Sequence, residues 1–320
     1  MLAIGKPVMS SQANSSSLGV GSTAQPQTTA VLALIGSAAL WGISWYPFRL
    51  LEAAGVSGVW AIIATELAAT VLCLAFFWRQ IFQSPKQAVG GASSAASNFR
   101  TVALIGLLGG ATNTGFILAT LHGDVLRATL FLYLAPLWTL FLARWLLAEP
   151  ISLSGVGVVL MALTGAGVML GPSAISGEMG IGDGLGIMAG LAYAAYNVSV
   201  RRAEHIPQAQ KTLAATLGSA AVAAVALVFY GTQGWPASLP ASAWTLVMAT
   251  GALLVLVVSL MQFGLMRVTA TRAIVILVSE LFFAAASAWW LADEVPGVRE
   301  FIGGALIISA SLIAAGVGRR

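Results

Sequence analysis

The chain has 320 residues, of which 58% are apolar and 8% charged, and its mean hydropathy is +0.91. Soluble domains carry about 25% charged residues, so this composition excludes a fully water-exposed surface and predicts that most of the surface faces lipid. The net charge of +4 does not indicate nucleic-acid binding, because the few basic residues are scattered between apolar runs. One cysteine excludes an intrachain disulfide, and two distant histidines form no metal-binding motif.

The chain begins with a polar segment, and residues 1–29, rich in Ser, Gln, Thr, Ala and Gly, predict a disordered cytoplasmic tail. Apolar runs of about 20 residues follow, the length that crosses a hydrocarbon core of about 30 Å. Residues 80–100 are Ser- and Ala-rich and predict a loop. The predicted transmembrane helices are 31–50, 58–78, 101–121, 125–147, 152–171, 181–200, 212–230, 242–265, 270–292 and 299–317.

Basic residues predict the orientation of these ten helices. With the amino terminus in the cytoplasm, only Arg49, Arg127 and Arg299 fall on the opposite side, and the remaining Lys and Arg residues are cytoplasmic. Cytoplasmic loops carry the excess of positive charge in membrane proteins. The sequence therefore predicts an all-α multi-pass protein of a cell membrane, the inner membrane in bacteria, with both termini in the cytoplasm.

The two halves of the chain resemble each other. Arg127–Glu149 aligns with Arg272–Glu294 at a constant shift, including Trp145-Leu146 over Trp290-Leu291. Five helices in each half is an odd number, so the second half must run upside down relative to the first. We therefore predict two inverted repeats, 30–171 and 180–318, which is how many secondary transporters are built.

A second alignment joins the first helix of each half. Trp41, Trp45 and Arg49 match Tyr193, Asn197 and Arg201 at the same spacing of four residues. Residues four apart share one face of a helix, so each set points in one direction.

Several motifs in this order carry a family resemblance. Leu40-Trp41-Gly42 precedes Arg49, Leu134-Ala135-Pro136 precedes Glu149 and a Gly-rich helix, and Ser279-Glu280-Leu281 precedes Glu294 and Gly303-Gly304. The chain thereby resembles the ten-helix, EamA-type transporters of the drug/metabolite transporter (DMT) superfamily. Within that superfamily it is most similar to the YddG-type exporters of aromatic and other amino acids.

The resemblance has two departures. The family often has Glu-Pro in the ninth helix, where this chain has Glu280-Leu281, and a basic residue in the second helix, where Glu66 stands. Carboxyl groups inside a membrane are costly and are functional candidates by default. Glu280 is a candidate to bind a substrate amine or to carry a proton, and Glu66 is a second intramembrane acid that could be structural or coupling.

The remaining site candidates are aromatic or polar groups at membrane depth. Aromatic walls suit apolar substrates and hold an ammonium group by cation–π contact, although Trp and Tyr also line membrane boundaries. Asn and Gln could bind a carboxylate, or only join helices. Pro47 and Pro136 are predicted hinges. The predicted substrate-binding residues are Trp41, Trp45, Asn113, Tyr133, Trp138, Tyr193, Asn197, Gln262 and Glu280.

Together these features predict a secondary transporter that exports amino acids, aromatic ones included, by alternating access and needs no cofactor or metal. Export of drugs or other metabolites is the alternative, followed by a channel or a scaffold without transport. An enzyme is not expected, because no nucleophile elbow, P-loop, metal motif or histidine cluster is present.

Overall fold

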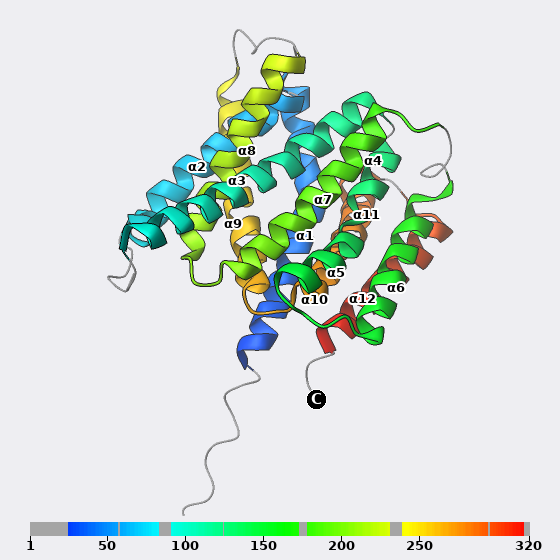
Figure 1. The fold of residues 1–320 in the computed structure, drawn as a ribbon. Coiled ribbons are helices and arrows are strands. Elements are labelled where there is room, and N and C mark those ends of the chain that lie inside the picture. Colours follow the sequence, from blue (N-terminus) through cyan, green and yellow to red (C-terminus); the bar gives the residue numbers. More distant parts are fainter. Residues whose placement is uncertain are drawn as a thin grey trace, which may run out of the picture.

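The computed structural model describes residues 25–56, 58–82, 91–123, 125–172, 178–230, 239–293 and 295–316. Within these ranges the regular elements are α-helices, and no strand occurs (Figure 1). The helices are α1 (Gln25–Ala53), α2 (Gly58–Phe82), α3 (Gly91–His122), α4 (Val125–Leu132), α5 (Ala135–Leu146), α6 (Leu153–Leu170), α7 (Ile181–Arg202), α8 (Gln208–Tyr230), α9 (Ala241–Leu265), α10 (Ala270–Leu277), α11 (Glu280–Ala292) and α12 (Val298–Gly316).

The ten predicted transmembrane helices are confirmed, with the fourth and ninth each divided into two parts, α4–α5 and α10–α11. Two local predictions differ from the structure. Helix α1 begins at Gln25, inside the predicted tail, and residues 1–24 lie outside the described ranges. The prediction of a loop over 80–100 is wrong at both ends, because α2 continues to Phe82 and α3 begins at Gly91. Ala and Ser are tolerated in a helix once its apolar continuation is anchored.

Nine spans in the described part of the chain are long and apolar enough to cross a membrane, counting α4–α5 and α10–α11 as one span each. The tenth span, α7, has 22 residues, which cover about 33 Å at 1.5 Å per residue. It is less apolar because it carries Asp183, Asn197 and two arginines. It packs against α3, α4, α5, α9 and α10, whereas Met188 and Leu191 on its outer face are exposed.

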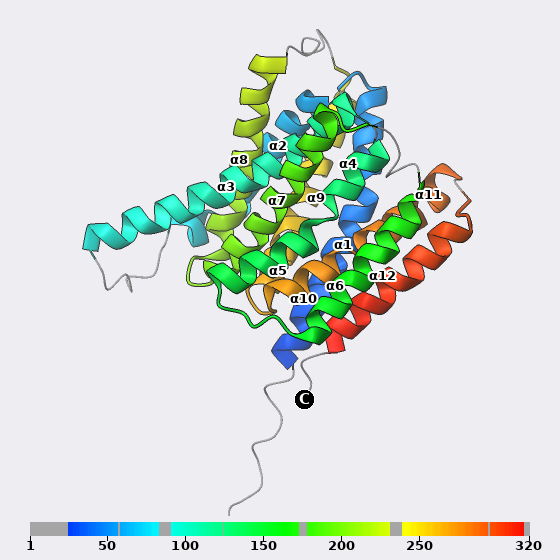
Figure 2. The same cartoon turned by 45° about the vertical axis from the view of Figure 1, so that its right-hand side comes forward.

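The first helix of each half packs against helices of the other half (Figures 1 and 2). Helix α1 packs against α9, α10 and α11 of the second half, and α7 packs against α3, α4 and α5 of the first. Helix α2 packs against its counterpart α8, and α6 against its counterpart α12. Both divided spans end at matched residues in the left-handed region, Ala148 with φ of 55° and Asp293 with φ of 56°. The backbone thus repeats the symmetry that the sequence predicted.

The α6–α12 contact shows why these helices are rich in glycine. A Cβ at Gly303 would lie 2.5 Å from the Gly165 carbonyl oxygen, and a Cβ at Gly165 would lie 2.8 Å from that of Gly303. Small residues let membrane helices approach to backbone contact. These two helices form a scaffold at one side of the bundle, away from the α7 core (Figure 2). The ends of α1 and α12 that lead to the two termini lie at the same end of the bundle (Figure 1).

Candidate functional site

The breaks in the fourth and ninth spans occur at the same place in the two repeats. Leu134 joins α4 to α5, and Ser279 joins α10 to α11. In the first repeat Pro136 has no N–H to donate back to the preceding turn, which explains the break. In the second repeat Leu281 replaces the proline, and the Ser279 hydroxyl instead donates to the Ile276 carbonyl at 2.6 Å, tightening the turn.

These breaks bring Tyr133 and Glu280 together in the middle of the bundle. Tyr133 is buried, and its hydroxyl interacts with the Glu280 carboxyl. Tyr193 of α7 also lies close enough to interact electrostatically with Glu280, and its hydroxyl is 4.0 Å from the Met261 sulfur of α9. Tyrosine side chains from two other spans therefore interact with one carboxyl group.

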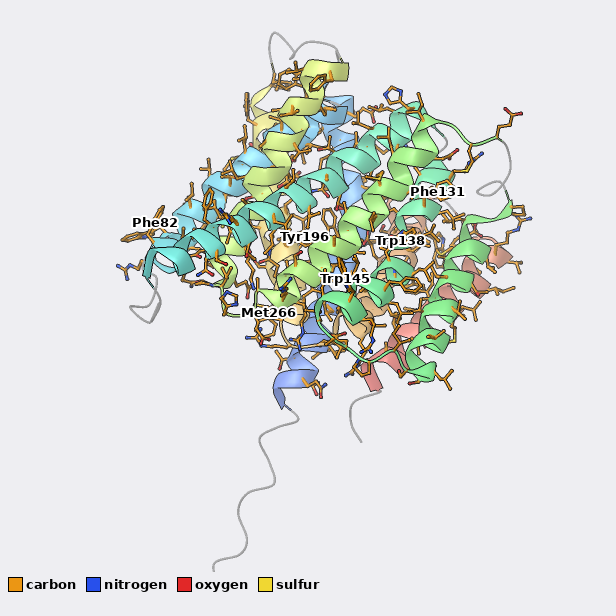
Figure 3. The ribbon with its side chains drawn as sticks, in the orientation of Figure 1. Phe82, Phe131, Trp138, Trp145, Tyr196 and Met266 are labelled. Carbon is orange, nitrogen blue, oxygen red and sulfur yellow. The ribbon has the colours of Figure 1, made fainter. Side chains whose placement is uncertain are left out.

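Two polar side chains on α7 and α5 have hydrogen-bonding atoms that are not fully used. Asn197 is completely buried, one turn after Tyr193, and its side chain interacts with the Tyr193 hydroxyl, while its amide atoms have no well-formed hydrogen bond in the described part of the chain. The Trp138 indole N–H of α5 is likewise buried without a partner there. Figure 3 labels Trp138 of α5 and Tyr196 of α7, two helices that pack against each other. Buried polar atoms are nearly always bonded, so these atoms are free to bind a ligand or water.

The predicted aromatic residues of α1 contact other groups in this state. The Trp45 indole donates to the Ser287 hydroxyl at 2.8 Å, and Ser287 donates to the Gly42 carbonyl at 2.8 Å, so Trp45 ties α1 to α11. Trp41 packs in a separate apolar cluster with Ala69 and other residues of α2, α8 and α9. Helix α1 continues through Pro47, whereas Pro136 lies at a break.

The other predicted polar residues form a second group, between α2, α3 and α8. The Asn113 amide donates to the Glu66 carboxyl at 3.1 Å and to the Ser219 hydroxyl at 3.1 Å. Nearer the other end of the same face of α8, Gln262 accepts a hydrogen bond from Thr212, and its amide donates to the Tyr196 hydroxyl at 2.9 Å. Asn113 and Gln262 thus bond within the protein and lie apart from Glu280.

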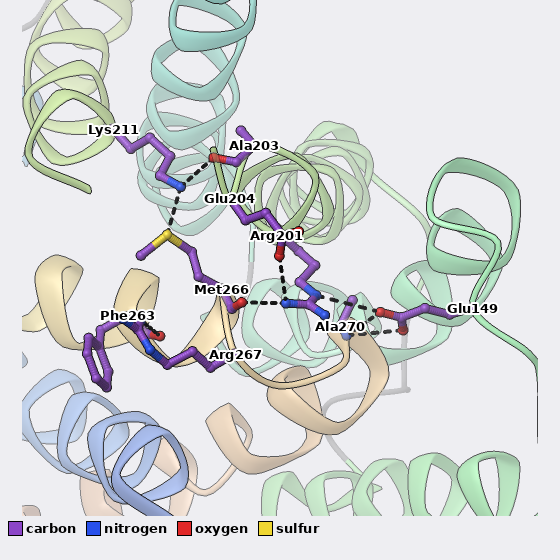
Figure 4. Close-up of polar contacts among 9 residues, drawn as sticks. All are labelled: Glu149, Arg201, Ala203, Glu204, Lys211, Phe263, Met266, Arg267 and Ala270. Atoms are coloured by element: carbon purple, nitrogen blue, oxygen red, sulfur yellow. Dashed lines mark hydrogen bonds and ion pairs between the residues drawn. The ribbon is translucent and has the colours of Figure 1, made fainter. Parts of the chain in front are cut away.

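A third polar group closes one end of the bundle (Figure 4). Both carboxylate oxygens of Glu149 lie 3.1 Å from the Ala270 N–H, the first of α10. The Arg201 guanidinium lies 4.0 Å from Glu149 and also donates to the Met266 carbonyl. Glu149 therefore ties the first repeat to the end of α7 and to the positive N-terminus of α10. We call Glu149, Arg201 and the Ala270 N–H the end latch.

Several of these residues had no predicted role. Lys211 is fully buried and donates to the Ala203 carbonyl at 2.8 Å. Asp183 pairs with Arg127 at 2.7 Å, joining α7 to α4. Thr212, Thr216 and Ser219 recur at helical spacing on α8, a signal that the sequence did contain. Within the described residues no cluster of His, Cys, Asp and Glu could hold a metal ion.

Comparisons with known proteins agree with this architecture. A solved structure described only as a crystal structure of a protein is 20% identical, with a TM-score of 0.72, and the match covers 92% of this chain and 98% of that chain. At this identity the likeness shows the fold alone. No curated protein matches. The family model of EamA-like transporters matches residues 28–171 and 180–316. The chain belongs to the EamA-like transporter family and is a multi-pass membrane protein that transports small molecules.

Proposed function

We propose that this transporter is an alternating-access carrier that exports amino acids, aromatic ones included. Two observations support this most: the Glu280 carboxyl interacts with Tyr133 and Tyr193, and the Asn197 amide and Trp138 indole offer polar atoms inside the neighbouring helices α7 and α5. An α-amino acid carries an ammonium and a carboxylate, which match these two kinds of group.

The ammonium group fits the Glu280 end of the site. A carboxylate next to the aromatic rings of Tyr133 and Tyr193 combines charge pairing with cation–π contact. The substrate carboxylate would accept hydrogen bonds from the Asn197 amide and the Trp138 indole. The side chain of the substrate would lie among Met261 and neighbouring apolar residues, and an apolar or aromatic side chain suits these surroundings.

Alternating access is supported by the inverted repeats and by an asymmetry between their ends. The end latch holds Arg201 at one end, whereas Arg49, its repeat counterpart at the other end, is exposed. We interpret this as a state closed at the Arg201 end, which the positive-inside rule makes cytoplasmic. Export as the direction follows the family resemblance, and helical spans favour a cell membrane, since bacterial outer membranes hold β-barrels.

The test is counterflow of labelled phenylalanine and tryptophan in liposomes containing the purified protein. We expect saturable counterflow that Glu280→Gln reduces at least about tenfold, because a hydrogen bond to a charged group is worth about 1.5–3 kcal/mol. Glu52→Gln, at an exposed acid near the end of α1, is the matched control and should behave as the parent.

The same assay separates the amino-acid proposal from the alternative of a drug exporter. Phenethylamine has the ring and the ammonium group of phenylalanine without the carboxylate. It should compete weakly if Asn197 and Trp138 bind a carboxylate. Equal competition by both compounds would favour a carrier of cationic drugs, and the absence of any amino-acid counterflow would refute the substrate assignment.

A further inference from the structure

A second carboxyl group lies buried outside the proposed substrate site. Glu66 of α2 is 5% exposed, and its partners are the neutral groups of Asn113 and Ser219. None of the ion pairs among the described residues involves Glu66. An ionised carboxylate held only by neutral groups in a membrane is costly, and it is stable once it carries a proton or meets a cation.

The charged residues on the helices that pack against α2 also lie away from Glu66 along the chain. Those helices are α1, α3, α8 and α9, and α9 contains no titratable residue. Tyr196 of α7 is the neighbour that interacts electrostatically with Glu66. The other described charged or titratable groups on the packed helices lie toward helix ends, and they are Tyr46, Arg49 and Glu52 of α1, Arg100 and His122 of α3, and Lys211 of α8.

Three buried hydroxyl groups are spaced along the face of α8 between its Lys211 end and Glu66, and among the described residues they bond to other groups rather than to one another. Thr212, Thr216 and Ser219 are each at most 2% exposed and follow one another at intervals of four and three residues, so they share one face of α8. The Thr70 hydroxyl of α2 donates to Thr216 at 3.0 Å, and Ser219 adjoins the Glu66 carboxyl. We call Thr212, Thr216 and Ser219 the hydroxyl line.

The hydroxyl line starts at the end of the bundle that the latch closes. Thr212 follows Lys211, whose ammonium group contacts Ala203 and Met266 beside the latch (Figure 4). Hydroxyl groups both donate and accept hydrogen bonds, so a line of them can relay a proton. The amide nitrogen of Asn113, rather than an oxygen, faces Glu66, and donors of this kind suit a carboxyl group better than a metal ion.

We propose that Glu66 is a proton-carrying site, separate from the substrate site at Glu280, and that the hydroxyl line connects it to the Lys211 end. The inference rests on the proposed carrier function. In one state the Glu66 carboxylate takes a proton from hydronium on one side of the membrane, which becomes water, and forms an O–H bond. In the other state this bond breaks and the proton leaves to water on the opposite side, so charge and atoms balance over the cycle.

Helix α7 links the two sites. Tyr193 faces Glu280, and Tyr196, three residues later, accepts a hydrogen bond from Gln262, which itself accepts one from Thr212. Glu66 and Asn113 belong to the first repeat, whereas Ser219 belongs to the second. Movement of the repeats past one another would therefore change the surroundings of Glu66 while α7 moves against the substrate.

The test measures two activities of each variant in liposomes. One is phenylalanine counterflow at equal pH, and the other is phenylalanine accumulation driven by a pH gradient. Glu66→Gln should keep counterflow and lose accumulation, whereas Glu280→Gln should lose both. Thr216→Val should slow accumulation at least about threefold, and Thr250→Val is its matched control, because Thr250 is buried on α9 and bonds only its own helix.

Two results would overturn the inference. One is that accumulation by the parent protein does not depend on the pH gradient, and the other is that accumulation by the Glu66→Gln protein depends on it as much as in the parent. Infrared spectroscopy gives a test that needs no substrate. The parent should show a protonated-carboxyl C=O band that shifts in D₂O, and Glu66→Gln should lose it. A band unchanged by Glu66→Gln refutes the proton site, whereas loss of the band without amino-acid counterflow refutes only the substrate assignment.

Discussion

Replacing Glu149 by glutamine should open the end latch. Glutamine keeps an oxygen that accepts the Ala270 N–H, so the variant loses the charge and little else. The two 3.1 Å contacts share one N–H and count as one charge-assisted hydrogen bond. Losing its charge costs about 1 kcal/mol. The helix N-terminus adds about 0.5 kcal/mol, and the part-exposed Arg201 pair about 0.5 kcal/mol.

The total of about 2 kcal/mol is about a 30-fold change in an equilibrium constant. Because the latch joins the repeats in this state, its loss should raise the population open at the Arg201 end by that factor. A cysteine at position 197, one turn from Arg201, reports this opening in a background without Cys73, the single native cysteine. A membrane-impermeant maleimide added at the Arg201 end should label Asn197→Cys about 30-fold faster when Glu149→Gln is present.

The control is Glu204→Gln. Glu204 also pairs with Arg201, at 3.4 Å, but its side chain is 65% exposed, so its loss should change labelling less than about threefold. An unchanged labelling rate in the Glu149→Gln protein would refute the latch, as would faster labelling only from the opposite end.

Two further predictions concern the scaffold. Gly303→Ala should lower the thermal unfolding temperature in detergent, because the added Cβ meets backbone at 2.5 Å, whereas Gly157→Ala, with open space around it, should not; equal temperatures would contradict the close α6–α12 contact. Arg127→Gln leaves Asp183 buried without its 2.7 Å partner and should destabilise the protein by about 3–5 kcal/mol, seen as loss of monodisperse protein in size-exclusion chromatography; an undiminished yield would show that the pair is not required.

The helices and the similarity of the two halves could be predicted from the sequence, because both depend on local or repeated patterns of residues. Span length is set by bilayer thickness, so the ten runs could be located without knowing how they pack. The repeat was visible because Arg127 and Arg272 begin matched segments, and the structure divides both at the same step. The residue limits of the repeats and the cytoplasmic position of the termini stay predictions.

The candidate site could be predicted from the sequence only in part, because apolar residues face both the lipid and the interior of the bundle. In a soluble protein the polar residues of a helix show which side faces water, and so how the helix is rotated about its axis. In this membrane protein both sides of α1 are apolar, so the sequence did not indicate which helices Trp41 and Trp45 contact. Glu280 stood out in the sequence as an acid at depth. Its contact with Tyr133 depends on the break between α10 and α11. The sequence does not indicate this break, because the second repeat has no proline there.

The burial of Lys211 and the meeting of Glu66 with the hydroxyl line were likewise decided by tertiary packing. Glu66 and Ser219 are more than a hundred residues apart in the sequence, and Lys211 is a charged side chain of a kind that is usually exposed. A local pattern specifies that a segment is helical and long enough to span the membrane. Which polar groups share an interior depends on how each helix is rotated about its axis, and that rotation is set by the packing of all ten spans together.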